Sequence, residues 1–276
     1  MTLNLIDVVV FVGFIAAVIT IGLWKSRNEK TGEDYFLAGR GLKWWLIGFS
    51  LIAANISSEQ FVGMSGNAAS HVGLAIASYE WMAAVTLVIV GFAFLPYFLR
   101  AGIYTMPEFL EYRYNSTART IMAVATLFIY MLLLGSVTYS GALTINTMAN
   151  KMGYSVPIAT ASLVIGIIAM VYVAAGGLKA CAWADLIQGS ALILGGAVVM
   201  IFAFKKLGGA TDELAFVENV RTGAVGFKSF GAETGAVDRF WELNKVRMNM
   251  FLPRDDKILP WTALLLGLWI PNFYYW

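Results

Sequence analysis

The chain has 276 residues, of which 59% are hydrophobic and 13% are charged, and its formal net charge is +2. Soluble domains carry about 25% charged residues, so this composition excludes an ordinary soluble enzyme, a disordered protein and a nucleic-acid-binding protein. The net charge is too small to indicate an acidic partner. One cysteine, Cys181, and one histidine, His71, argue against a disulfide framework, a multi-cysteine or histidine metal site and a Ser-His-Asp triad. We therefore expect a polytopic membrane protein that is not an enzyme.

Seven apolar stretches are predicted as transmembrane helices, each near the roughly 20 residues that cross about 30 Å of hydrocarbon. They are 4–24, 44–66, 72–99, 120–148, 155–175, 183–204 and 258–276. The runs are continuous, whereas membrane-spanning strands alternate in polarity, so the predicted fold class is all-α. The first stretch lacks a basic start and a small-residue cleavage site, and we expect it to remain in the mature protein.

Orientation follows from the Lys and Arg residues in the short loops, which are enriched on the cytoplasmic side. One side of the membrane would hold nine of them, in loops 25–43, 100–119 and 176–182: Lys25, Arg27, Lys30, Arg40, Lys43, Arg100, Arg113, Arg119 and Lys179. The short loops on the other side hold only Lys151. We therefore predict a multi-pass protein of the cell (inner or plasma) membrane with an extracytoplasmic N-terminus. Long loops cross largely regardless of charge, so 205–257 is an extracytoplasmic loop.

Four acids lie within or at the edge of these segments: Asp7, Glu59, Glu80 and Asp185. Intramembrane acids are costly and usually face a cavity, a partner or a cation. Glu80 follows Val72 by eight residues, which places it about 12 Å from the outer face and close to the midplane. Asp7 and Asp185 lie near the two faces. His71, in a short outer loop, is interpreted as a solvated residue.

The second segment has an unusually polar centre, Asn55-Ile-Ser-Ser-Glu-Gln60. Asn and Ser compete for backbone hydrogen bonds, so we predict a helix broken near 55–58 with freed carbonyls facing inward. Pro271 and Asn272 predict a similar interruption of the seventh segment. Two broken segments in corresponding positions indicate a secondary transporter. The alternatives are a polar cluster that only joins helices and a proline kink without function.

These residues resemble the solute:sodium symporter family, and within it the sodium/sugar cotransporters. The resemblance rests on six blocks: Asp34-Tyr-Phe-Leu-Ala-Gly39, SLIAANISSEQFVGMSG (50–66), ASYEWM (77–82), IYTMPEFLEYRY (103–114), GGLKACAWADLIQ (176–188) and NFYYW (272–276). It implies a broken-helix fold of five-helix inverted repeats, with 4–24 as an extra helix, 44–204 as the first repeat and 258–276 as the start of the second. Because the last segment ends at Trp276 without a polar flank, we expect a truncated chain whose missing C-terminal helices are a partner.

The resemblance also implies roles for individual residues. The predicted substrate site contains Gln60, Glu80 and Asn272, together with Glu59 beside Gln60. The predicted gates are Tyr275 on the inside and Met64 and Tyr79 on the outside. The predicted sodium ligands are the backbone carbonyls of Ala53 and Ile56, and Asp185 is the acid on the ion's exit route.

Two positions depart from the sugar-transporting relatives, where Ala83 replaces a serine and Leu133 or Leu134 replaces an asparagine. The expected function is sodium-coupled symport of a neutral, glucose- or galactose-like sugar by alternating access. The alternatives are proton coupling with Glu80 as the titrating group, sodium symport of a polyol or other small solute, and a sensor or channel. The expected partners are therefore sodium, a small sugar and the lipid bilayer, with no nucleic acid.

Overall fold

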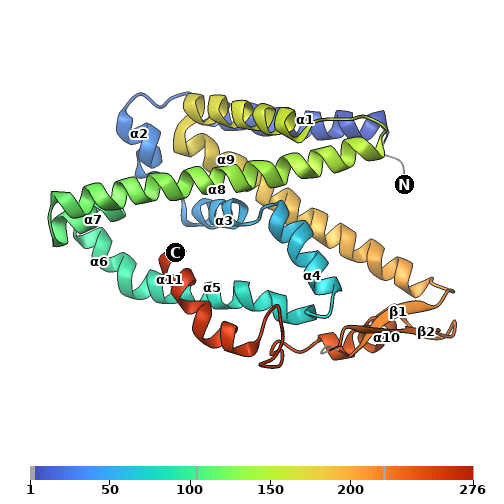
Figure 1. The fold of residues 1–276 in the computed structure, drawn as a ribbon. Helices are drawn as coiled ribbons and strands as arrows, with labels where there is room; N and C mark the ends of the chain where they lie inside the picture. The colour runs from blue at the N-terminus through green and yellow to red at the C-terminus, as the bar shows by residue number, and fades with distance from the viewer. Residues whose placement is uncertain (1–3, 104, 220–221, 276) are drawn as a thin grey trace. The chain divides into compact units, whose positions relative to one another are not determined.

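The structure, a computed structural model, describes residues 4–103, 105–219 and 222–275, with side chains up to Phe273. Figure 1 traces the chain from blue at the N-terminus to red at the C-terminus. The chain divides into two compact units. The first unit comprises Met1–Phe61 and Leu133–Ile201, and the second comprises Val62–Leu132 and Phe202–Trp276.

Helical turns cover most of each of the seven predicted membrane segments. Four continuous helical stretches of the described chain are long and apolar enough to cross a membrane: α1 (Leu5–Ser26), Gly73–Arg100, α8 (Ser116–Lys151) and α9 (Ile158–Gly208). The stretch Gly73–Arg100 contains α5 (Ser78–Ile89), a π-helical turn (Val90–Phe94) and α6 (Leu95–Arg100). Two shorter apolar helical stretches are α3 (Trp44–Asn55) and Ala263–Phe273.

The 51-residue helix α9 contains two of the predicted segments, because it kinks at Gly177. This residue has φ 60° and ψ −165°, a conformation that is essentially restricted to glycine. A Cβ at this position would lie 2.7 Å from the Tyr35 carbonyl oxygen. The predicted loop at 176–182 is therefore wrong, because the chain bends sharply at Gly177 and continues directly as helix.

Helix α2 (Gly32–Leu37) docks at this bend. It begins with a capping box in which Asp34 N donates to Thr31 Oγ1 at 3.0 Å and Thr31 N donates to the Asp34 carboxylate at 3.1 Å. The hydroxyl of Tyr35 then donates to the Val173 carbonyl at 2.9 Å. The block that starts at Asp34 is therefore explained by local capping and by a contact with the last turn before the kink.

Small residues line the helix contacts of the first unit, where they allow close backbone approach. A Cβ at Gly22 of α1 would overlap the hydroxyl of Tyr172, and one at Gly189 of α9 would lie 3.5 Å from the Ala53 Cβ of α3. The buried alanines of this unit are Ala38, Ala142, Ala161, Ala180, Ala182 and Ala184.

The second unit contains the only strands among the described residues. In the predicted loop 205–257, β1 (Leu214–Asn219) and β2 (Ala224–Lys228) form an antiparallel hairpin that packs against α10 (Ala236–Asn244). Buried Arg239 connects this region by donating to the carbonyls of Thr234, Leu207, Ala210 and Gly231 at 2.6–3.1 Å. The all-α prediction therefore holds for the membrane segments, and the loop has an ordered fold that it did not anticipate.

The predicted interruption at Pro271 is wrong in its position. Pro271 lies inside α11 (Trp269–Tyr275), and the irregular backbone is the π-helical turn Ala263–Gly267 before it. Proline has no amide to donate one turn back, so its effect falls on the preceding turn. A cluster of Val72, Ala75, Leu252, Leu259 and Leu264 packs beside this turn.

The remaining elements are short. They are α4 (Ser65–Ala69), α7 (Met106–Arg113), a π-helical turn (Glu59–Met64) and 3-10 turns at Ala38–Arg40, Gly73–Ala77 and Lys245–Arg247.

Candidate functional site

The second membrane segment is broken where its sequence predicts. Helix α3 ends at Asn55, Ile56 is extended with φ −94° and ψ 99°, and the π-helical turn starts at Glu59. In a continuous helix the Ser57 amide would donate to the Ala53 carbonyl, but here it donates to Gln60 Oε1 at 2.9 Å. The Ala53 carbonyl thus loses the donor that a continuous helix would provide.

Ser57 and Gln60 form a variant of a capping box for the chain that follows the break, because the Ser57 hydroxyl accepts from the Glu59 amide and not from the Gln60 amide. Gln60 Oε1 accepts from both the amide and the hydroxyl of Ser57, at 2.9 and 2.7 Å, and the Glu59 amide donates to Ser57 Oγ at 3.1 Å. This reciprocal bonding is typical of a Ser-x-x-Gln helix start. This role of Gln60 was not predicted, although the spacing of Ser57 and Gln60 is the signal for it.

The end of α3 suits a cation. The Ala53 carbonyl without its helical donor and the negative end of the helix dipole coincide there, and unwound carbonyls coordinate sodium in transporters. Gly189 of α9 faces Phe49 and Ala53 in the last turns of α3. One turn before Gly189, half-buried Asp185 accepts a hydrogen bond from Ser50 Oγ at 2.5 Å. An acidic group therefore lies on the same pair of helices as the freed carbonyl.

Two serines of α8 contact the residues after the break. Ser136 Oγ donates to Glu59 Oε1 at 3.2 Å, and the hydroxyls of Ser140 and Ser58 are hydrogen-bonded. Neither Ser136 nor Ser140 was predicted as a site residue. No local signal distinguishes them from hydroxyls that only bond within their own helix, as Thr147 does with Leu143.

The other predicted site residues lie in the second unit. Tyr79 and Glu80 are exposed in the first turn of α5, which α11 contacts, and Met64 is half-buried. In α11, the half-buried Asn272 donates through Nδ2 to the Leu268 carbonyl at 2.8 Å. The Tyr275 side chain is outside the described residues. Since Gln60 belongs to the first unit, the convergence of Gln60, Glu80 and Asn272 stays a prediction.

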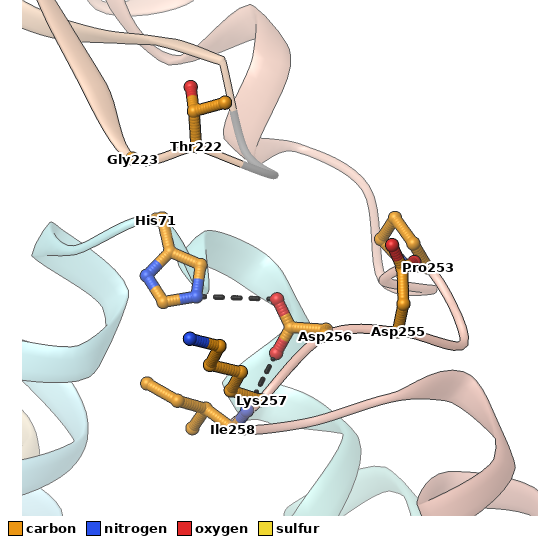
Figure 2. Close-up of a pocket in the computed structure, with 8 residues that line it drawn as sticks. All are labelled: His71, Thr222, Gly223, Pro253, Asp255, Asp256, Lys257 and Ile258. Carbon is orange, nitrogen blue, oxygen red and sulfur yellow. Dashed lines mark hydrogen bonds and ion pairs between the residues drawn. The ribbon is translucent and has the colours of Figure 1, made fainter.

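His71 is not the solvated residue that the sequence suggested. Its Nε2 lies 3.3 Å from Asp256 Oδ2, and the two side chains are only 24% and 5% exposed (Figure 2). Asp256 Oδ1 accepts from the amides of Ile258 and Leu259, both at 2.9 Å. The pair borders a cavity of about 480 Å³ that Thr222, Pro253, Asp255 and Lys257 also line. Residues 185 positions apart carry no local signal for such a pair.

Electrostatics at Asp256 combine opposing effects. Burial raises the pKa of this carboxyl, but the Leu259 and Ile258 amides and the nearby His71 together hold it below its usual value. The described residues contain no group of three or more His, Cys, Asp or Glu side chains that could hold a metal ion.

A set of apolar helices with one broken at its polar centre is the architecture of a secondary transporter. The comparison with known families agrees with this class, since the model of the sodium:solute symporter family matches residues 35–272. The chain belongs to the sodium:solute symporter family.

Similar proteins cover nearly the whole chain. A sodium/glucose cotransporter of Vibrio parahaemolyticus is 43% identical over 99% of this chain and 47% of its own length. Sodium/glucose cotransporter 1 of Ovis aries is 32% identical over 99% of this chain and 40% of its own length. The uncharacterized symporter YidK of Escherichia coli is 34% identical over 99% of this chain and 45% of its own length. The chain thus spans less than half the length of these relatives.

Among solved structures, a sodium-coupled sialic acid symporter in a substrate-bound, outward-open state has the same fold. Its TM-score is 0.73 at 21% identity, and the match covers 98% of this chain and 51% of that one. This likeness concerns the fold alone and confirms the predicted truncated transporter architecture.

Proposed function

We propose that this chain is part of a sodium-coupled symporter that takes up a neutral, glucose- or galactose-like sugar by alternating access. The observation that carries the proposal is the broken helix, where the Ser57 amide binds Gln60 and leaves the Ala53 carbonyl free of its helical donor. Two of the similar proteins are sodium/glucose cotransporters, which supports both the ion and the substrate class.

Sodium is the proposed coupling ion, held by the carbonyl oxygens of Ala53 and Ile56 and leaving past Asp185. An inward sodium ion releases about 2.3 kcal/mol per 100 mV of membrane potential. A tenfold inward gradient adds about 1.4 kcal/mol. Their sum supports accumulation of the sugar by a few hundred-fold per ion, which is ample for uptake from dilute medium.

The substrate would be bound by uncharged and acidic hydrogen-bonding groups. Gln60 uses its carbonyl oxygen in the capping box, so its amide group is the part available to donate to a sugar oxygen. The carboxylates of Glu59 and Glu80 would accept from sugar hydroxyls, and Asn272 would both donate and accept. Tyr275 would close the site from the inside and Met64 and Tyr79 from the outside.

The proposal places the protein in the cell membrane with its N-terminus outside, and it requires no covalent chemistry from the chain. It also requires the helices that the relatives carry beyond the matched region, because the Ala53 and Ile56 carbonyls alone do not complete an ion's coordination. We expect 44–204 to act as the first repeat and 258–276 as the start of the second.

A polyol or another neutral solute is the second candidate. Ala83 and Leu133 or Leu134 occupy positions where sugar-transporting relatives carry hydroxyl-binding side chains. Fewer polar partners would favour a substrate with a different number or arrangement of hydroxyls. Proton coupling through Glu80 is the remaining alternative for the ion.

The test is uptake of radiolabelled galactose and glucose by proteoliposomes that contain the full-length protein carrying this chain. We expect saturable uptake with an inward sodium gradient and none when choline replaces sodium. Uptake that follows a pH gradient without sodium would refute sodium coupling. Sodium-driven uptake of a polyol, with no competition by either sugar, would show that the substrate is a polyol and not glucose or galactose.

A further inference from the structure

The helix α8 bonds to the chain that follows the break in the second segment. Ser136 and Ser140 are four residues apart, so they lie on one face of α8. Ser136 Oγ donates to Glu59 Oε1 at 3.2 Å, and the Ser140 hydroxyl is hydrogen-bonded to that of Ser58. All four residues belong to the first unit. Two consecutive residues after the break are thus each held by one turn of α8.

These bonds complement the capping box. The box fixes Ser57, Glu59 and Gln60 relative to one another, but it does not fix how this turn is rotated about its own axis. A second helix that bonds to two neighbouring side chains supplies that constraint. The rotation in turn decides where the Glu59 carboxylate and the Gln60 amide point.

Leu133 lies on the same face of α8, three residues before Ser136. The resemblance implies an asparagine at the position of Leu133 or of Leu134 in sugar-transporting relatives. The polar contacts described here for this stretch of α8 are made by Ser136 and Ser140, further along the helix. The two serines of α8 therefore contact the predicted site by hydrogen bonds to Glu59 and Ser58.

We propose that Ser136 and Ser140 are positioning residues for the solute-binding turn, with Ser136 orienting the Glu59 carboxylate toward a hydroxyl of the substrate. This inference rests on the proposed function. A hydrogen bond from Ser136 occupies Oε1 and leaves Oε2 to accept from the solute. Specificity among neutral polyhydroxylated solutes would then depend on residues of α8 that do not themselves touch the solute.

The contact can be tested without transport. Cys181 is the only cysteine, so it is replaced by serine and the pair Ser58→Cys and Ser140→Cys is introduced into the full-length protein. We expect a disulfide on mild oxidation, because the two hydroxyls are in contact. The control pair is Ser58→Cys with Thr147→Cys, about 10 Å further along α8, and should not cross-link. Failure of the first pair to cross-link in a monodisperse protein overturns the proposal.

The positioning role is tested by kinetics. Ser136→Ala should raise the half-saturating sugar concentration about fivefold, the loss of roughly one hydrogen bond, while the maximal rate and the sodium half-saturation stay within twofold. Ser136→Thr keeps a hydroxyl and should restore the affinity. Thr147→Ala removes a hydroxyl that bonds only within α8 and should leave the affinity unchanged.

An equal fall of maximal rate in Ser136→Ala and Thr147→Ala, with no change in sugar affinity, would show a general effect on the helix and would overturn the positioning role. If the Ser58→Cys/Ser140→Cys variant cross-links as expected but the parent protein shows no sodium-dependent uptake, the proposed function is refuted, and the substrate role of Ser136 with it. The two failures are therefore distinguishable.

Discussion

The hydroxyl of Ser50 donates a hydrogen bond to the Asp185 carboxylate at 2.5 Å and so joins α3 to the second half of α9. Ser50 precedes Ala53 by three residues and is therefore on the same face of α3. The acid predicted on the ion's exit route is thus bonded to the helix whose end supplies the predicted ion ligand. A change at either residue should affect the ion before it affects the sugar.

We expect Asp185→Asn to lower the sodium-dependent turnover by about tenfold while the sugar affinity changes less than twofold, because a neutral amide no longer attracts the departing cation. Ser50→Ala should have a smaller effect in the same direction, since it only frees the carboxylate. Initial uptake rates against sodium and against sugar concentration measure both quantities. A selective loss of sugar affinity in Asp185→Asn would contradict the ion role.

Because backbone carbonyls are the proposed ion ligands, a substitution that changes the backbone at the break should alter the half-saturating sodium concentration more than substitutions that change only side chains. Ser57→Pro removes the amide that donates to Gln60 Oε1 and should raise the sodium half-saturation by at least about tenfold. Ala53→Val and Ile56→Ala keep their carbonyls and should change it less than about threefold. Sodium-dependent uptake of the three variants is the measurement. A normal half-saturating sodium concentration in Ser57→Pro would show that the broken helix does not form the ion site.

Glu80 is expected to bind the solute. Glu80→Ala should abolish sugar binding in the folded protein, because a carboxylate that accepts from a hydroxyl contributes about 1.5–3 kcal/mol, or a factor of ten or more in affinity. Equilibrium binding of labelled sugar measures the effect, and gel filtration in detergent checks the fold. Unchanged affinity in Glu80→Ala would mean that the assignment is wrong.

The kink in α9 should be intolerant of any side chain. Gly177→Ala would place a Cβ 2.7 Å from the Tyr35 carbonyl oxygen at φ 60° and should destabilise the protein by about 3 kcal/mol. Gly195→Ala is the matched control, because it lies in the same helix with no atom within 4 Å of the added Cβ, and it should be neutral or stabilise by up to about 1 kcal/mol. Thermal unfolding in detergent compares them. Equal melting temperatures would contradict the contact of α2 with the kink.

The lowered pKa of the Asp256 carboxyl predicts that the free energy of unfolding depends on pH. Its pKa is lower in the folded protein than its usual value, so its contribution to the free energy of unfolding is present above the unfolded pKa of about 3.9 and is lost as the pH falls through the folded pKa. Asp256→Asn should therefore cost about 1 kcal/mol at pH 7, and this cost should shrink as the pH falls below about 3.9. Exposed Asp255, in the same turn, is the control through Asp255→Asn. A constant difference across this pH range would show that the carboxylate's charge is not involved.

The positions of most helices were predictable from the sequence, because the bilayer acts as solvent for every residue of a membrane segment. Apolar run length predicts α1, α8 and both halves of α9, since a bilayer leaves a backbone no alternative to internal hydrogen bonds. The break near Asn55 was predictable for a related reason, because its polar residues compete locally with the helix. The bonds between Ser57 and Gln60 also join residues only three positions apart, so they too were predictable from the local sequence, although they were not predicted.

The remaining features depend on contacts between distant parts of the chain. Ser136 bonds to Glu59 across 77 positions and His71 pairs with Asp256 across 185, so neither leaves a periodic or motif-like trace. The irregular turn lies before Pro271, at Ala263–Gly267, where Leu264 packs with Val72, Ala75, Leu252 and Leu259, residues that are distant in the sequence or in another segment. Sequence alone therefore determined which segments are membrane helices and where the second one breaks. Only the tertiary structure decided which side chains hold that break in place, because those bonds form after helices from separate parts of the chain have packed.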